Sequence, residues 1–306
     1  MSSRFAVGEI LWADWIQDKI LLAVSFEDKI AIRELCERAV AEEDTSSMIW
    51  LIYGQWMQSE YNRLTASEER PNGGRNSQQS QFASSEEKAL AAEIFGWPQL
   101  LSVWNRGAEQ TKWRINDSQQ LWDPYTDLRI RDISSTPSPE AISSMKYWFM
   151  NRLQTPHATW DQTSQNFSTF ISTYDNTNWE SIMITANQLS DTKQKYDMRD
   201  FYEINVLRAG QKGDPEAQLQ AFQEYIDYEL SLTRKKNAYS FELVNSLFQR
   251  ATLKFPSNTE LWESYAMFLH EEVAHHAGKS YLYFLFLFLV SNPEHLKPNQ
   301  CTRFVS

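Results

Sequence analysis

Aromatic residues spaced three positions apart recur along the chain, and this recurrence constrains the fold more than any other feature. They are Trp12 and Trp15, Trp50 and Tyr53, Trp122 and Tyr125, and Trp262 and Tyr265, with a variant at Phe222, Tyr225 and Tyr228. Residues three or four apart lie on one face of a helix, so each set predicts a helix that presents an aromatic stripe to a neighbour. We expect these rings to pack in a core.

A second pattern follows the aromatic helices, in which a small residue comes directly after an arginine. It is found at Arg38-Ala39, Arg106-Gly107-Ala108 and Arg250-Ala251, with a degenerate copy at Arg152. The small residue permits two helices to approach closely, and we expect the arginine to reach a carboxylate or a helix carbonyl of the next repeat. Two helices per unit of about 35–45 residues are typical of helical solenoids. We therefore predict an all-α fold, a right-handed stack of about five to six antiparallel helix pairs resembling tetratricopeptide repeats.

The spacing of the repeats predicts where they are interrupted. Trp50 and Trp122 are 72 positions apart, which is too far for one unit. The excess falls in residues 61–93, whose Gly-, Ser- and Gln-rich run predicts a low-complexity insert loop within the second repeat. A second break, Ser134 to Pro139, separates the helices of the third repeat. We assign the repeat domain to residues 1–275, and we expect the atypical hydrophobic tail, 276–306, to lie outside the fold.

The net charge and the length of the apolar runs disfavour two partners, RNA and the membrane. The formal net charge is −11, and an acidic surface repels phosphates, so direct RNA binding by this chain is expected to be weak. The longest apolar run, residues 281–290, is half of the roughly 20 residues that a membrane span needs, so we expect a soluble protein. Cys36 and Cys301 form no disulfide framework, which suits a reducing compartment.

No pattern in the sequence predicts catalysis, a cofactor or a metal site. A helical zinc site needs histidines four apart, whereas His270 and His275 are five apart, about 140° around a helix. Cys36 has no histidine near it in sequence and is expected to pack in a core. We predict no catalytic, cofactor-binding or metal-binding residues. Three tryptophans outside the repeat positions, Trp97, Trp113 and Trp148, are candidates for an exposed partner-binding face, because aromatic anchors dominate interfaces.

The repeat motif resembles a known family. The Trp-x-x-Tyr helix followed by Glu37-Arg38-Ala39 resembles the half-a-tetratricopeptide (HAT) repeat of RNA-processing factors. Within that group, residues 11–15, 37–40 and 49–55 are similar to the N-terminal half of the U4/U6 snRNP recycling factors. The run 225–229, which ends in Tyr228-Glu229, and the later run 248–251 match a second signature of that family. The resemblance covers roughly residues 8–272, and nothing in the chain resembles the RNA-recognition domains that those factors carry beyond their repeats.

The resemblance implies a non-catalytic, nuclear scaffold for pre-mRNA splicing. Its expected partners are protein components of snRNPs, with RNA contacted only indirectly or weakly and with a homodimer left open. Alternatives are a HAT scaffold of mRNA 3′-end cleavage and polyadenylation, and a direct RNA-binding repeat module. A chaperone adaptor would require a repeated lysine and asparagine clamp that is not visible in the sequence.

Overall fold

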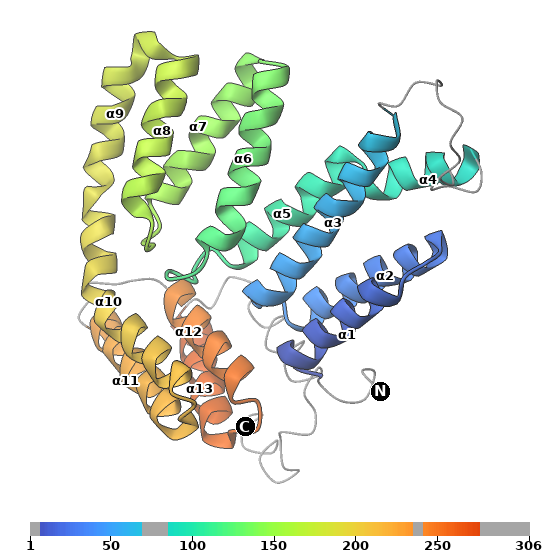
Figure 1. Ribbon diagram of the computed structural model, residues 1–306. Helices are drawn as coiled ribbons and strands as arrows, with labels where there is room; N and C mark the ends of the chain where they lie inside the picture. Colours follow the sequence, from blue (N-terminus) through green and yellow to red (C-terminus); the bar gives the residue numbers. More distant parts are fainter. Residues whose placement is uncertain (1–6, 69–84, 235–240, 276–306) are drawn as a thin grey trace. The chain divides into compact units, whose positions relative to one another are not determined.

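A computed structural model describes residues 7–68, 85–234 and 241–275, and within these ranges the chain contains helices and no strand (Figure 1). The predicted all-α, helical-repeat fold is confirmed. The α-helices are α1 (Glu9–Leu22), α2 (Phe26–Glu42), α3 (Ser47–Glu68), α4 (Ser85–Phe95), α5 (Trp97–Gln110), α6 (Gln119–Ser135), α7 (Pro139–Leu153), α8 (Trp160–Tyr174), α9 (Trp179–Asn187), α10 (Asp191–Gln211), α11 (Pro215–Arg234), α12 (Phe241–Lys254) and α13 (Thr259–His275). Two short 3-10 helices, η1 (Asn176–Asn178) and η2 (Gln188–Ser190), flank α9.

The chain forms two compact units, which are described separately. The larger unit spans Glu9–Gly213 and holds α1 to α10. Its helices pack mainly against helices close to them in sequence: α1 on α2, α5 on α6, and α7 on α8, while α3 packs on α5, across the short helix α4. Helix α3 also contacts α1 and α6, so it is shared by the first three repeats. This sequential packing is how a solenoid buries a continuous core.

Serine residues start two of the helices in this unit. The Ser25 hydroxyl accepts a hydrogen bond from the Asp28 amide (3.1 Å), and the Asp28 carboxylate accepts one from the Ser25 amide (2.8 Å). This reciprocal pair is a capping box, and it begins α2. Ser138 caps α7 in front of Pro139, while α6 ends at Ser135, so the predicted break in the third repeat is confirmed.

Helices extend into both ends of the predicted insert, residues 61–93. Helix α3 continues to Glu68 and α4 begins at Ser85, whereas the low-complexity run between them lies outside the described residues. At the end of α4, the Phe95 ring packs edge-on against Trp56 (5.6 Å between centroids) and Phe26 (6.3 Å). Within the insert itself, Leu64 of α3 and Ala91 of α4 are buried, so each end has an apolar side chain that the helix covers.

The smaller unit, which begins at Asp214, is built from α11, α12 and α13. Its core is aromatic: the Phe248 ring stacks on Tyr265 (5.0 Å between centroids) and on Phe268 (5.5 Å). The predicted hydrophobic tail, 276–306, lies outside the described residues.

The close approach of α3 and α5 depends on Gly54. A Cβ atom at this position would lie 2.8 Å from two atoms of the rigid Trp104 indole. We expect Gly54→Ala to lower the free energy of unfolding, because overpacking costs about 1–3 kcal/mol while alanine gains at most about 1 kcal/mol over glycine in a helix. Urea unfolding measures the change. Gly210→Ala, at an exposed helical position in α10, is the matched control and should not destabilise the chain. If Gly54→Ala is as stable as the wild-type chain, the close packing of Gly54 against Trp104 is contradicted.

Candidate functional site

The two sequence patterns meet within each repeat through an arginine that lies over an aromatic ring. The guanidinium carbon lies 5.7 Å from the ring centroid for Arg38 and Trp12, 5.0 Å for Arg106 and Trp50, 4.7 Å for Arg152 and Trp122, and 5.8 Å for Arg250 and Phe222. In each pair, the ring comes from the first helix of a repeat and the arginine from the second. Cation–π contacts of this kind contribute about 0.5–2 kcal/mol, more where they are desolvated.

At four places along the chain, a tryptophan indole N–H also joins a helix to the end of the helix that precedes it. The indole donates to a backbone carbonyl from Trp50 to Asp44 (2.6 Å), from Trp122 to Ala108 (2.9 Å), from Trp160 to Leu153 (3.0 Å) and from Trp262 to Pro256 (2.8 Å). Each acceptor lies in the last turn of the preceding long helix or just after it. Carbonyls at a helix C-terminus have no partner within the helix, so the indole supplies one. This role requires tryptophan, since phenylalanine has no N–H.

The structure places most of the repeat-signature residues in the interior. Those that are buried are Trp12, Trp50, Trp122, Tyr53, Tyr125, Tyr225, Tyr265, Glu229, Arg152, Arg250, Ala39, Ala108 and Ala251. Tyr228, Arg106 and Trp262 are half-buried, and Arg38 is exposed. The recurring geometry of these side chains is therefore mainly a feature of the repeat framework.

Two aromatic positions differ from expectation. Trp15 was predicted to share the inward stripe with Trp12, but 38 % of its surface is exposed and its ring stacks on that of Trp12 (5.2 Å). Trp148 was a candidate for an exposed partner face, yet it is buried and stacks on Trp122 at 3.9 Å. Trp97 and Trp113 are half-buried. Helical spacing gives the relative direction of two side chains but not which neighbouring helices cover them, so it could not separate these cases.

A polar network joins the second helix of the first repeat, α2, to the second helix of the second repeat, α5. Arg106 of α5 donates two hydrogen bonds to the Glu37 carboxylate of α2 (2.7 and 3.0 Å), and the Tyr53 hydroxyl donates a third (2.6 Å). Burial raises the pKa of Glu37, but the hydrogen bonds from Arg106 and Tyr53 outweigh burial and hold this pKa below its usual value. The predicted direction of the arginine was wrong here: Arg106 reaches back to the preceding repeat, where the Glu37 carboxylate of α2 lies within hydrogen-bond distance.

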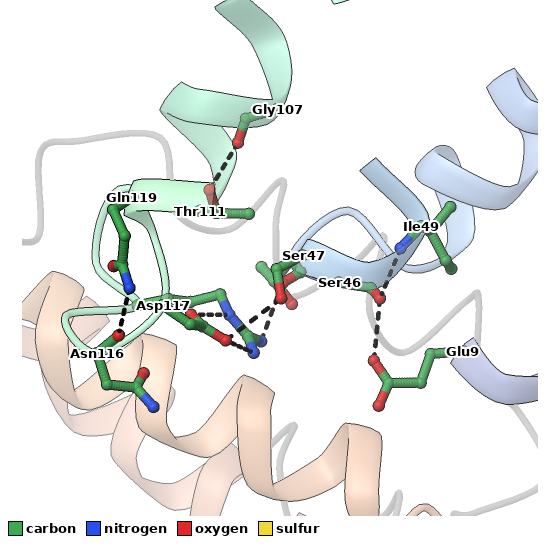
Figure 2. Close-up of polar contacts among 11 residues, drawn as sticks. Glu9, Ser46, Ser47, Ile49, Gly107, Thr111, Asn116, Asp117 and Gln119 are labelled. Carbon is green, nitrogen blue, oxygen red and sulfur yellow. Dashed lines mark hydrogen bonds and ion pairs between the residues drawn. The ribbon is translucent and has the colours of Figure 1, made fainter. Parts of the chain in front are cut away.

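The turns between repeats are also tied together by polar side chains (Figure 2). The Ser46 hydroxyl donates to the buried Glu9 carboxylate of α1 (2.9 Å) and the Ser47 hydroxyl to Asp117 (3.3 Å), which lies in the turn before α6. Arg114 pairs with Asp117 (2.6 Å) and also donates to the Thr45 carbonyl (3.2 Å). The turn before α3 is thus fixed to the first and third repeats at once.

The described side chains contain no cluster of three metal-binding groups. Helix α13 runs to His275, so His270 and His275 lie five positions apart on one helix, as the sequence indicated. Cys36 is fully buried, and burial raises the pKa of its thiol to about 12, which leaves it protonated at neutral pH. Glu42 accepts a hydrogen bond from the Trp12 indole (3.1 Å). Among the described residues, every helix is too short or too polar to span a membrane.

The paired helices and the recurring arginine–tryptophan contacts define a helical-repeat protein of the tetratricopeptide-like class. The chain is distantly homologous to the spliceosome associated factor 3, a U4/U6 recycling protein. It is 23 % identical to the proteins of that name from Mus musculus and from Homo sapiens over 273 residues, or 89 % of the chain. This homology confirms the predicted resemblance. The chain spans 23 % of the length of each relative, and no protein-family profile matches the sequence.

Proposed function

We propose that this chain is a non-catalytic scaffold that binds proteins in splicing-related RNA processing, within the nucleus. The observation that carries the proposal is the homology to a U4/U6 recycling protein over 89 % of the chain. Its partners are protein components of snRNPs, and RNA is held indirectly, since the net charge of −11 opposes phosphate binding.

The architecture supports a scaffold role through the rigidity of its repeats. Indole hydrogen bonds link successive repeats, and the Glu37, Arg106 and Tyr53 network links two second helices. A stack that is fixed in this way presents an extended surface at little entropic cost on binding. Such a surface holds several proteins in a set geometry without any covalent step.

The test is affinity purification of the full chain from nuclear extract, with and without ribonuclease. We expect snRNP proteins to be retained after ribonuclease treatment. Loss of every protein partner on treatment would contradict the proposal and indicate a direct RNA-binding module. Recovery of cleavage and polyadenylation proteins in place of snRNP proteins would contradict the assignment to splicing and leave the scaffold role intact.

A further inference from the structure

A polar pocket lies between the second helices of the first two repeats. It is lined by Arg33 and Glu37 of α2 and by Pro98, Gln99, Ser102, Val103 and Arg106 of α5. Its volume is about 180 Å³. One water occupies about 30 Å³ of liquid, so the pocket has room for the end of a side chain from another molecule.

Cations outnumber anions among the residues that line the pocket. Arg33 and Arg106 face one carboxylate, that of Glu37, in a chain whose net charge is −11. The Arg106 guanidinium is already held in place by its two bonds to Glu37 and by the Trp50 ring beneath it. Pro98 and Gln99 lie in the first turn of α5, so at this edge of the pocket the helix dipole adds partial positive charge.

Arg33 supplies the second observation that points to a ligand. Its Nε atom is buried and has no hydrogen-bond acceptor among the described residues. Burying a charged donor without an acceptor is unfavourable, so a carboxylate that reaches the Arg33 guanidinium would supply an acceptor that the described residues lack. The amide of Gln99 and the hydroxyl of Ser102 are further polar groups at the pocket wall.

We propose that this pocket binds the carboxylate side chain of an acidic segment in a partner protein. The inference rests on the proposed scaffold function and names the chemistry of one contact within it. A planar carboxylate matches the geometry of the guanidinium groups and accepts from two donors at once. The pocket concentrates positive charge locally on an acidic surface, so it also selects for a short acidic segment over an extended polyanion, which the rest of the surface repels.

The experiment observes Arg33 directly, by NMR of the arginine Nε–H groups in the full chain. The signal is assigned by its absence in Arg33→Gln. The probe is an acetylated, amidated peptide of alternating glycine and glutamate, with the glutamine-for-glutamate peptide as its neutral match. We expect the acidic peptide to shift the Arg33 signal and the neutral peptide to leave it in place. An Arg33 signal that neither peptide moves at millimolar concentration, or that a short oligouridine RNA moves more than the acidic peptide, would overturn the proposal.

The variant experiment separates the pocket from the scaffold function. We expect Arg33→Gln to weaken binding of the acidic peptide at least tenfold with unchanged thermal unfolding. Arg131→Gln, which removes an equal charge from an exposed position on α6, should have little effect. Equal affinities of the two variants would refute the role of Arg33. If the wild-type chain captures no nuclear protein but still binds the acidic peptide through Arg33, the scaffold function fails and the pocket stands.

Discussion

Trp50→Ala is expected to lower the free energy of unfolding by about 3–5 kcal/mol, the largest effect of any single substitution proposed for this chain. The indole is 3 % exposed and lies in the fourth position of α3. Truncation to alanine removes apolar surface from the core and leaves a cavity beside α5 that the surrounding helices fill only in part. Such cavities account for the upper end of the cost of large-to-small substitutions.

Polar contacts of Trp50 add to this loss. Its N–H donates to the Asp44 carbonyl (2.6 Å), and Arg106 lies over its ring (5.0 Å). Without the indole, the turn after α2 loses a link to α3, and the guanidinium loses the ring that supports it. Urea unfolding followed by circular dichroism measures the change.

Trp15→Ala is the matched control, because it truncates the same residue type in the first repeat at a position that is 38 % exposed. We expect it to cost clearly less than Trp50→Ala. If Trp50→Ala retains wild-type stability, or if both variants lose the same amount, the assignment of Trp50 to the core and of Trp15 to its edge is incorrect.

His157 is expected to make the stability of the larger unit depend on pH. This side chain is buried in the turn between α7 and α8. The Thr155 carbonyl only accepts, so Nδ1 carries the proton and donates to it (2.7 Å), while Nε2 accepts from the Thr163 hydroxyl (2.8 Å). Burial, and next the positive charge of Arg152, lower the pKa of His157 to about 2.

The sign of the effect follows from which state binds the proton. An unfolded histidine is protonated below its pKa of about 6.5, whereas the folded one stays neutral down to about pH 2. The unfolded state therefore binds more protons in this window, and stability falls as the pH falls through it. At pH 4.5 the loss attributable to His157 is about 2–3 kcal/mol relative to pH 7, from about 1.4 kcal/mol per unit.

A comparison of wild type with His157→Gln isolates this contribution, since all other titrating groups are shared. The free energy of unfolding is measured in urea at pH 7 and pH 4.5 for both proteins. The difference between the two pH values should be smaller in the variant by about 2–3 kcal/mol. Parallel stability curves for the two proteins would show that His157 titrates normally in the folded chain.

Helical class and repeat pairing were predictable from the sequence because they depend on local spacing. Aromatic residues three apart mark one face of a helix wherever they occur, and an arginine followed by a small residue marks the companion helix. The residues that carry these patterns, such as Trp50 and Arg106, do meet in the structure. The break between Ser134 and Pro139 was visible for the same reason, since serine and proline act on the backbone within a few residues, and the structure shows Ser138 capping α7 there.

The contacts between repeats were decided by the tertiary structure. The spacing of Trp160 matches no aromatic pair, yet its indole joins α8 to α7; Trp148 lies outside the repeat positions, yet it stacks on Trp122. The Arg33 pocket is lined by α2 and α5, which an insert separates in sequence, so it exists only in the folded chain. Periodicity fixes the direction of a side chain relative to its own helix. Which helix covers that side chain, and hence which groups are buried, paired or left open to a partner, depends on the packing of segments far apart in the chain.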